Sequence, residues 1–501
     1  MADLSLITLD LIRKDKKPLD RKTKVVCTLG PACWSVENLS KLINAGMNVA
    51  RFNFSHGDVA GHTGVLERLR EAMKQTGKTV AVLLDTKGPE IRTGFIDPSL
   101  GGKLKLIKDS IIEIGTNYEQ KCTSEYLACS YPSLSKSVSI GSKILCADGA
   151  VTFEVTELKE TSVMARVLNN ASFGDRKNMN LPGAIVDLPT CTDIDITAIK
   201  EFAVKQKVDF IAASFVRKAS DIDTIRKLCG EEGKHIKIIS KIENQEGLEN
   251  YDEILENGDG IMVARGDLGM EIPIERVFLA QKDMIRKANI AGKPVVTATQ
   301  MLESMITNPR PTRAECADVA NAVLDGTDCV MLSGETANGE FFEEACSMMC
   351  RICLEAEAMV DYDAIHTDLR TQSLARVTTL PHPESVAGAA VQIAIDLKAT
   401  IIVVITQTGY TARMVAKYRP SAKIIAVTNE GNVKSQSLGY LKGVSAVMTS
   451  DDLNPVQGPA AVQFAKHQGL CNDGDVAIIV RGSVELANTS GGSNLIHVMN
   501  I

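Results

Sequence analysis

Two short stretches of the chain end in charged residues that could hold a metal ion and a phosphorylated substrate. Residues 238–243 (IISKIE) and 261–267 (IMVARGD) each begin as an apolar run, which is typical of a buried strand. They end in Lys241 and Glu243, and in Asp267. The C-terminal ends of parallel strands converge on one face of a barrel, so these groups are expected to meet. Two carboxylates beside an ammonium suit a hard divalent cation and an anionic substrate. Surface ion pairs are the alternative, and the apolar residues before each charge disfavour them.

Length and composition exclude several classes of protein. At 501 residues the chain is long enough for about three domains. A net charge of −7 argues against a nucleic-acid-binding protein, which usually carries a basic patch. We expect no membrane segment and no signal peptide, because there is no apolar run of ~18 residues and the start lacks a basic and apolar leader. A cytoplasmic location follows. The 13 cysteines have no paired spacing and are expected to be reduced.

A strand–helix alternation begins at Lys24 and predicts the elements that position the charged residues. Apolar runs mark eight strands, at 24–30, 49–55, 80–86, 210–215, 236–243, 260–267, 294–300 and 329–336. Helical periodicity lies between most of them, for example at 36–45 before Gly46 and at 220–229 before Gly230, where glycine suits a helix C-cap. The predicted fold class is α/β, a (β/α)₈ TIM barrel rather than an open sheet.

The alternation is interrupted once and then resumes as a separate unit. Residues 88–187 lack helical periodicity and contain short β-rich pieces such as 137–140 and 151–155, so they predict an inserted all-β lid over the catalytic face. After Pro381 a C-terminal α/β domain begins. Its predicted elements are a helix at 386–397, a strand at 401–406, a helix at 410–418 and strands at 424–428 and 476–480. The expected boundaries are 1–20 for an N-terminal tail or short helix, 21–87 with 188–355 for the barrel, 88–187 for the lid and 356–501 for the last domain.

Six motifs in these positions resemble the pyruvate kinase family over nearly the whole chain. They are MNVARFNFSHG at 47–57, DTKGPEIRTG at 85–94, IISKIENQEG at 238–247, ARGDLG at 264–269, ATQMLESM at 298–305 and LSGETA at 332–337. The resemblance implies a homotetramer of three-domain subunits. It also implies a glycolytic phosphotransferase that transfers the phosphoryl group of phosphoenolpyruvate to ADP, giving pyruvate and ATP through a metal-bound enolate that is then protonated.

The resemblance assigns roles around the transferring phosphoryl group. Glu243 and Asp267 would hold Mg²⁺ or Mn²⁺, and Lys241 would lie against the phosphoryl group. Cations are needed here because phosphoryl transfer depends on positioning and charge stabilisation. Backbone N–H groups at Ala264, Arg265, Gly266 and Asp267 would receive the substrate carboxylate, while Arg51 and Arg92 would contact phosphate oxygens. Thr299, Ser333 and Glu335 would line the face that protonates the enolate. A water chain ending at Glu335 is physically preferable to Thr299 alone.

Two further sites follow from the same resemblance. Asn53, Ser55, Asp85 and the carbonyl of Thr86 correspond to a potassium site, and Glu90 matches the potassium-dependent members; simple pairing of Glu90 with a neighbouring base is the alternative. Pro31, Asn53, His56, Arg92, Asp148 and Lys177 match residues near the nucleotide. For His56, a hydrogen-bonded structural role remains open.

The C-terminal domain carries one candidate effector loop. Thr406, Thr408, Gly409 and Thr411 lie between a predicted strand and helix, where hydroxyls and backbone N–H groups can hold a phosphate. A capped helix without a ligand is the alternative. The only tryptophan is Trp34 and residues 482–488 contain no basic side chain, which argues against fructose 1,6-bisphosphate and leaves another phosphorylated effector, or none, open.

Two departures from the family pattern and two rival functions complete the sequence-based picture. Asp193-Ile194-Asp195 is interpreted as a changed helix start, and Asn178 stands where glycine is usual. A metal-dependent lyase or aldolase would share the enolate chemistry but needs no nucleotide lid. A non-catalytic paralogue would not need Lys241, Glu243, Asp267 and Thr299, and their presence argues against it.

Overall fold

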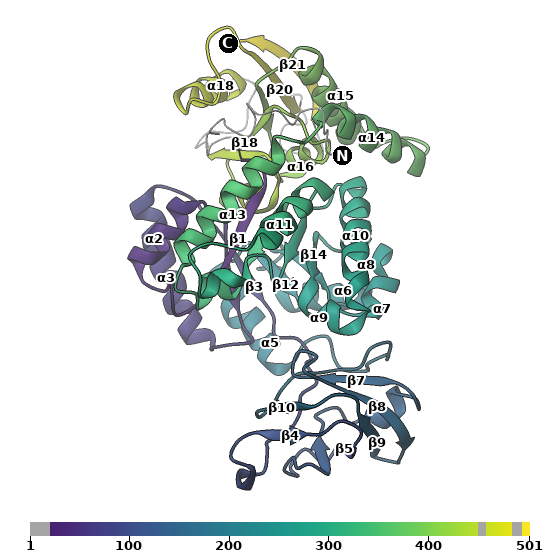
Figure 1. Cartoon of the computed structure of the whole chain (residues 1–501). Coiled ribbons are helices and arrows are strands. Elements are labelled where there is room, and N and C mark those ends of the chain that lie inside the picture. The colour runs from purple at the N-terminus through teal and green to yellow at the C-terminus, as the bar shows by residue number, and fades with distance from the viewer. Residues whose placement is uncertain (1–20, 449–456, 483–492) are drawn as a thin grey trace.

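The protein folds as three parts that follow one another along the long axis of Figure 1. This computed structural model describes residues 21–448, 457–482 and 493–501. The predicted tail or helix at 1–20 and most of the 482–488 stretch therefore lie outside the described residues. A helix-wrapped barrel lies in the middle, with a β-rich part on one side and an α/β part on the other.

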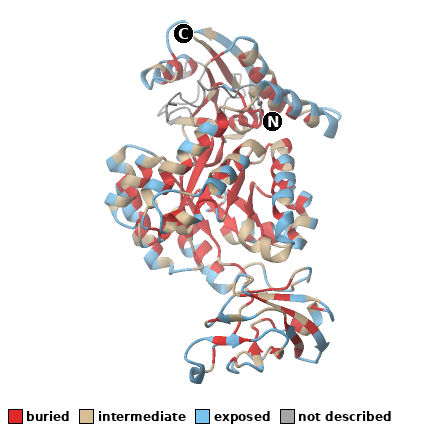
Figure 2. Ribbon diagram, in the orientation of Figure 1, coloured by how far each residue is buried: buried red, intermediate tan, exposed pale blue. Residues whose placement is uncertain are grey.

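Eight parallel strands close into the predicted barrel. Their order is β1-β16-β15-β14-β13-β12-β3-β2. They span Lys24–Thr28 (β1), Val49–Asn53 (β2), Ala81–Asp85 (β3), Phe210–Ala213 (β12), Lys237–Ile242 (β13), Gly260–Ala264 (β14), Val295–Ala298 (β15) and Cys329–Leu332 (β16). All eight predicted strands are confirmed. Most of their residues are buried and form the red centre of Figure 2, as expected for parallel strands covered by helices.

Helices and short turns connect and cover these strands. They are α2 (Val36–Ala45), α3 (Val59–Thr76), α5 (Asp193–Thr197), a π-helical turn (Ala198–Val204), α6 (Ala219–Cys229), α7 (Gln245–Glu249), α8 (Tyr251–Asn257), α9 (Arg265–Glu271), α10 (Val277–Ala291), α11 (Arg313–Asp325), α12 (Gly334–Ala337) and α13 (Phe342–Glu357). The predicted end of α2 is confirmed, because Gly46 has φ 121° and donates its N–H to Leu42.

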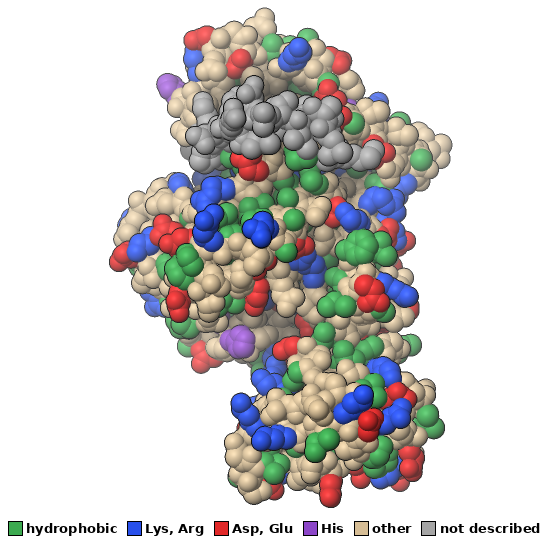
Figure 3. All heavy atoms as spheres, in the orientation of Figure 1, with side chains coloured by type: hydrophobic (Ala, Val, Ile, Leu, Met, Phe, Trp, Pro, Cys, Tyr) green, Lys and Arg blue, Asp and Glu red, His purple; other side chains and the backbone are tan. Residues whose placement is uncertain are grey.

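The insertion is β-rich, as predicted, and forms two sheets. Its elements are β4 (Leu104–Leu106), β5 (Ile111–Gly115), β6 (Tyr126–Ala128), α4 (Leu134–Ser137), β7 (Lys143–Cys146), β8 (Val151–Leu158), β9 (Ser162–Val167), β10 (Ala171–Phe173) and β11 (Met179–Asn180). The β-piece expected at 137–140 is wrong, because a one-turn helix ends there. The space-filling view shows this part joined to the barrel through a narrow waist (Figure 3).

The C-terminal part is an α/β domain built on a five-stranded sheet with the order β19-β18-β17-β20-β21. Its elements are α15 (His382–Asp396), β17 (Ile401–Ile405), α16 (Tyr410–Lys417), β18 (Lys423–Thr428), α17 (Gly431–Tyr440), β19 (Val444–Met448), α18 (Gln457–His467), β20 (Val476–Gly482) and β21 (Ser493–Asn500), with α14 (Tyr362–Arg376) leading into it. The predicted elements of this domain are confirmed to within a few residues.

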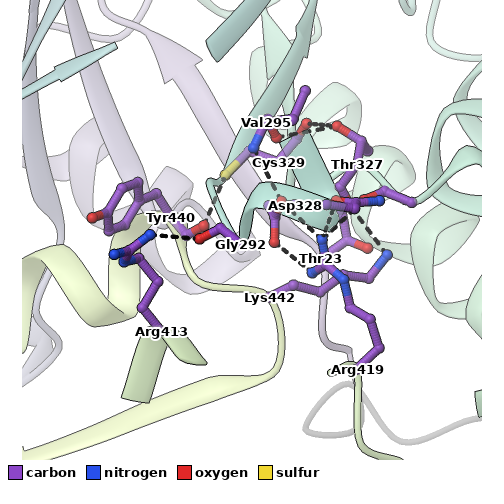
Figure 4. Close-up of polar contacts among 12 residues, drawn as sticks. Thr23, Gly292, Val295, Thr327, Asp328, Cys329, Arg413, Arg419, Tyr440 and Lys442 are labelled. Atoms are coloured by element: carbon purple, nitrogen blue, oxygen red, sulfur yellow. Dashed lines mark hydrogen bonds and ion pairs between the residues drawn. The ribbon is translucent and has the colours of Figure 1, made fainter. Parts of the chain in front are cut away.

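Buried polar contacts join this domain to the N-terminal ends of the barrel strands (Figure 4). The guanidinium of Arg419 pairs with the carboxylate of Asp328. The same carboxylate accepts the N–H of Val295, 3.0 Å away at the start of β15. Lys442 donates to the carbonyl of Thr327 at 3.1 Å. The C-terminal ends of the barrel strands, where the charged site residues are expected, therefore lie at the opposite end of the barrel. No helix within the described ranges combines the length and apolar character needed to cross a membrane.

Candidate active site

The predicted site residues gather at the C-terminal ends of the barrel strands, beneath the lid. Strand register brings them together: Asn53 of β2 is the partner of Asp85 at the end of β3, and Lys241 of β13 is the partner of Met262 in β14. Asp267 lies in the first turn of α9, which begins directly after β14. The ends of four strands thus supply one cluster of charges.

Lys241 is the centre of the cluster and is buried. Its Nζ donates to Asp85 Oδ1 at 3.0 Å and to the hydroxyl of Ser214 at 2.8 Å, and it lies 3.1 Å from Glu243 Oε1. Burial alone would lower the pKa of Lys241, but Asp85 and Glu243 raise it above its ordinary value. The lysine therefore remains a fixed positive charge in a site of low solvent access.

Arg51 forms a second cation on the same carboxylate. Its Nε donates to Asp85 Oδ2 at 2.6 Å, and its Nη1 donates to Thr28 Oγ1 at 2.8 Å. Burial would raise the pKa of Asp85, yet Arg51 and Lys241 hold it below the ordinary value. Asp85 is thus a buried anion that orients two cations toward the same space.

Glu243 and Asp267 supply the two carboxylates predicted to bind a divalent ion. Glu243 is 2% exposed and accepts the N–H of Phe215 at 2.6 Å. Loss of water contact and the charge of Glu243 raise the pKa of Asp267 to about 7. Two nearby carboxylates that resist simultaneous ionisation are the donor set that a divalent cation would relieve.

The residues after β15 and β16 border this cluster. Thr299 has φ 77°, and a Cβ on Gly266 would lie 2.9 Å from its methyl group, so only glycine allows this close packing. Glu335 is fully buried, and its two oxygens accept the N–H groups of Leu302 (3.0 Å) and Ser333 (2.6 Å). The carboxylate therefore holds the loops that carry Thr299 and Ser333.

The side chain of Arg265 points out of the site. It forms a bidentate pair with Asp318 at 2.7 and 2.8 Å and donates to the carbonyl of Thr299 at 2.7 Å. No side chain caps the start of α9 at Ala264. The Arg265 side chain is thus held by Asp318 and the Thr299 carbonyl, while Asp267 in the same turn contributes its carboxylate to the cluster.

The lid residues predicted to approach a nucleotide lie together at its edge. Arg92 pairs with Glu90, with Nη2 2.6 Å from Oε2, which is the simple pairing that the sequence left open. Asp148 and Asn178 exchange two hydrogen bonds, of 3.0 and 2.9 Å, and Lys177 donates its N–H to Thr93 at 2.9 Å. Asn178, which stands where the family pattern has glycine, thus fixes the turn at Asp148.

On the barrel side, Pro31 and His56 are exposed, and Asn53 and Ser55 are half-buried. Asn53 Oδ1 accepts the N–H of Ser55 at 3.1 Å. The ring Nε2 of His62 lies within hydrogen-bond distance, 2.8 Å, of the backbone carbonyl of His56. The ring of His56 takes no part in this contact. The imidazole of His56 is therefore not required for this local structure.

The candidate effector loop joins β17 to α16 and faces the barrel near the start of β13, away from the C-terminal ends of the barrel strands. Gly409 adopts φ 77° and donates its N–H to Thr406 Oγ1 at 3.1 Å, and the N–H of Tyr410 lies 3.4 Å from Thr408 Oγ1. Thr411 follows in the first turn of α16. A cleft beside the loop is also lined by Lys237, Lys293 and Arg413.

Three residues that the sequence analysis did not assign to the site help to organise it. Ser214 bridges Lys241 and the backbone of Thr86, while Asp195 accepts the N–H groups of Lys87 (2.8 Å) and Gly88 at the first lid linker. Arg217 donates to the carbonyls of Val186 and Leu188 (2.6 Å) at the second linker. Asp195 also completes a capping box with Thr192, which confirms the changed helix start. Polar residues just after apolar strands were the available signal for Ser214 and Arg217.

A closed barrel that gathers a buried lysine, two arginines and paired carboxylates beneath an inserted lid is the fold and site of a phosphoryl-transfer enzyme. Models of the pyruvate kinase barrel domain and of the pyruvate kinase alpha/beta domain match residues 20–346 and 384–499, and the chain belongs to the pyruvate kinase family.

Individual relatives agree with this assignment. The chain is 51% identical to a pyruvate kinase of Eimeria tenella, covering 95% of this chain and 89% of that one, and 49% identical to one of Dictyostelium discoideum, covering 96% and 94%. It is also 49% identical to a cytosolic isozyme from Nicotiana tabacum, covering 91% and 93%. A crystal structure of a pyruvate kinase from Cryptosporidium parvum superposes with a TM-score of 0.93 at 46% identity and 99% coverage of both chains.

Proposed function

We infer that the chain catalyses the reaction of its family, in which the phosphoryl group of phosphoenolpyruvate moves to ADP to give pyruvate and ATP. The observation that carries the residue assignment is the buried ammonium of Lys241, which is fixed by Asp85, Ser214 and Glu243 at the ends of the barrel strands. A fixed positive charge in a dry site stabilises a moving phosphoryl group more strongly than the same charge in water.

The chain's own residues divide the work on phosphoenolpyruvate. Lys241 and Arg51 face the phosphoryl oxygens from the C-terminal ends of the barrel strands, because Asp85 fixes both cations there. Backbone N–H groups of Arg265, Gly266 and Asp267 in the first turn of α9 receive the substrate carboxylate. The substrate is thereby held at both ends while its phosphoryl group points toward the lid.

Glu243 and Asp267 fit a divalent cation, Mg²⁺ or Mn²⁺, because both are carboxylates in a poorly hydrated place and the pKa of Asp267 is raised to about 7 beside Glu243. Such an ion would supply charge neutralisation between the substrate carboxylate and the phosphoryl oxygens. The N–H of Phe215 keeps Glu243 oriented at 2.6 Å.

A proton must reach the enolate that remains after transfer. Thr299 and Ser333 stand beside the site on loops that Glu335 holds through two backbone N–H groups. We assign the proton relay to these hydroxyls and to water along them, with Glu335 at its inner end.

We assign a potassium site to Asn53, Ser55, Asp85 and the carbonyl of Thr86, which are hard oxygen donors next to the phosphoryl space. Glu90 balances the positive charge nearby, since it pairs with Arg92. Replacing potassium by tetramethylammonium at constant ionic strength is expected to lower turnover strongly. Glu90→Lys should weaken that dependence, because an ammonium would repel the cation and take over its charge.

The nucleotide is proposed to bind between Pro31, Asn53 and His56 on the barrel and Arg92, Asp148 and Lys177 on the lid. The lid touches α9 directly: Asn180 donates to Glu271 at 3.0 Å. This contact favours a nucleotide-closing lid over the lyase or aldolase alternative. We also propose the domain boundaries at 88–187 for the lid and 356–501 for the C-terminal domain. The extents of β4–β11 and of the two family matches support them.

Assembly, location and regulation are proposals of the same kind. We propose a homotetramer, supported by exposed apolar side chains on α10 and β21, and a cytoplasmic location, supported by the cytosolic plant isozymes. The loop of Thr406, Thr408, Gly409 and Thr411 is proposed to bind a phosphorylated effector, supported by the three basic side chains that line its cleft.

A coupled assay tests the whole assignment. Purified chain is expected to form pyruvate from phosphoenolpyruvate only when ADP, a divalent ion and potassium are all present. Pyruvate production that needs no ADP would show that the enzyme is a lyase or phosphatase instead.

A further inference from the structure

The turn that follows β12 contacts three parts of the proposed site, namely Glu243, Lys241 and the first lid linker. Ser214 and Phe215 follow β12, and the N–H of Phe215 donates to Glu243 at 2.6 Å. Phe215 has φ 53°, an uncommon value for a side chain with a bulky ring, so the surrounding structure must hold it there. A Cβ on Gly88 would lie 2.8 Å from the Cβ of Ser214, so the first lid linker packs tightly over this turn.

The hydroxyl of Ser214 has one proton and three near neighbours, namely the Lys241 ammonium, the Thr86 carbonyl and Asp85 Oδ1. Oγ accepts from Lys241 Nζ at 2.8 Å, which uses a lone pair. The remaining proton has two acceptors within reach, the carbonyl of Thr86 at 2.5 Å and Asp85 Oδ1 at 3.3 Å. The N–H of Ser214 donates to Thr86 Oγ1 at 2.9 Å, which fixes the serine backbone to the same residue. The shorter contact assigns the hydroxyl proton to the Thr86 carbonyl.

That carbonyl is one of the oxygens assigned above to potassium, on which this inference rests. A cation and a hydroxyl proton on one carbonyl oxygen repel each other. Potassium binding would therefore turn the hydroxyl proton toward Asp85 Oδ1 while Oγ continues to accept from Lys241. The hydroxyl is small and buried, so this rotation needs no backbone movement.

We propose that Ser214 is a positioning residue that couples the monovalent-cation site to Lys241, so that potassium at the Thr86 carbonyl orients the lysine that stabilises the transferring phosphoryl group. The Ser214 hydroxyl, when it donates its hydrogen bond to Asp85 Oδ1, weakens that oxygen's hold on the ammonium and directs the lysine toward the substrate. Ser214 acts through Lys241 and needs no contact with the substrate.

Ser214→Ala tests the coupling. We expect turnover at saturating potassium to fall by about tenfold or more, as for a lost hydrogen bond to a charged group, with the KM for phosphoenolpyruvate changed less than threefold. Potassium should still bind, seen as a rise in Tm when potassium replaces tetramethylammonium, but its stimulation of turnover should shrink. The same substitution made in Lys241→Met should have almost no further effect, because the residue through which Ser214 acts is gone.

Two other variants keep the result interpretable. Ser240→Ala removes a buried hydroxyl without a hydrogen-bond partner from the neighbouring strand, and should leave potassium stimulation unchanged. Ser214→Cys repeats the test with a poor donor of similar shape if the alanine variant does not fold. Unchanged potassium stimulation in Ser214→Ala, or a full additional loss in the Lys241→Met background, would overturn the coupling alone. Absence of any potassium effect on Tm and turnover in the unmodified chain would overturn the potassium site itself and the coupling with it.

Discussion

At the scale of single residues, opposite charges are placed so that each is held by the next. Asp85 is fully buried and binds both Arg51 and Lys241, while Glu243 binds Lys241 from the other side. A buried cation with one partner removed would be costly, whereas here Arg51 and Lys241 are each paired with a carboxylate. The arrangement keeps the ammonium ionised and aimed at one point.

Removal of that ammonium is the most direct test of the assigned chemistry. Lys241→Met preserves the length and apolar character of the stem, so the chain should remain folded and bind phosphoenolpyruvate. Turnover should fall by about 10³-fold or more, as for the loss of one fixed electrostatic stabiliser. Lys227→Met, at an exposed lysine on α6, is the matched control for steady-state kinetics. Turnover of Lys241→Met within tenfold of the unmodified chain would contradict the assignment.

A second buried carboxylate, far from the catalytic face, makes stability depend on pH. Asp209 accepts the N–H of Val82 at 2.7 Å and the hydroxyl of Ser435 on α17 of the C-terminal domain. Burial raises the pKa of Asp209 to about 6. Between pH 4 and 6 the folded chain keeps this proton while the unfolded chain releases it. The contribution of Asp209 to the free energy of unfolding is therefore present below pH 4 and is lost as the pH rises through 6.

Asp209→Asn should remove this dependence, since an amide does not titrate. Moving from pH 4 to pH 7, the free energy of unfolding of the unmodified chain should fall relative to that of Asp209→Asn by up to ~3 kcal/mol. Urea unfolding at fixed protein concentration measures the difference, with the exposed Asp223→Asn as control. Parallel pH profiles for the unmodified chain and Asp209→Asn would show that Asp209 is ionised throughout.

What the sequence could reveal at this scale depended on local pattern. Lys241, Glu243 and Asp267 were identifiable because each follows an apolar strand, and the structure brings them together as expected. Ser214 was missed, since a serine after a strand is common and its partners lie 128 and 27 residues away along the chain. The outward turn of Arg265 was equally invisible, because Asp318 lies 53 residues further on.

At the scale of elements, the lid is held at both of its linkers. Asp195 binds the backbone at Lys87 and Gly88, and Arg217 binds the carbonyls of Val186 and Leu188. The lid touches α9 through Asn180 and Glu271, and through Met270, which packs against Gly149 beside Asp148. The helix whose first turn is proposed to receive the substrate carboxylate thus ends against the lid beside Asp148.

Removal of the lid should separate the two halves of the reaction. Replacing residues 92–183 by a short glycine–serine linker spares both linker contacts, so the barrel should remain folded. Phosphoryl transfer to ADP should collapse, because Asp148 and Lys177 are lost and water enters the site. Enolisation of pyruvate, followed as exchange of its methyl protons in deuterated buffer, should partly survive on the barrel. Equal loss of both activities with unchanged circular dichroism would contradict a lid role.

Periodicity predicted the barrel elements well and the lid elements poorly, for a physical reason. A strand buried on both faces, such as β14 with the sequence GIMVA, is a continuous apolar run, and a glycine such as Gly46 ends a helix visibly. The lid strands are short and half-exposed, so local sequence does not separate a strand from a turn. Residues 137–140 illustrate this, since Val138 is buried at the end of a one-turn helix rather than in a strand.

At the scale of the whole molecule, two exposed apolar surfaces lie on different domains. One is formed by Ile274, in the 3₁₀ turn before α10, and by Phe278 and Leu279 in the first turn of α10, with exposed fractions of 73%, 55% and 56%. The other is the edge strand β21, where Leu495 and Val498 are exposed. Edge strands and apolar patches of this kind mark contact surfaces. A tetramer with dihedral symmetry needs two different self-complementary interfaces, which these two surfaces can provide.

Charge placed on one surface should therefore halve the proposed tetramer without unfolding the subunit. Phe278→Glu combined with Leu279→Glu is expected to convert a tetramer into a dimer, because carboxylates would face one another across the two-fold axis. Sedimentation velocity at micromolar concentration measures the change, and circular dichroism checks the fold. Ile107→Glu, at an equally exposed isoleucine on the lid, is the control and should leave the tetramer intact. If the double variant still sediments as a tetramer, or the unmodified chain is a monomer, α10 is not an interface between subunits.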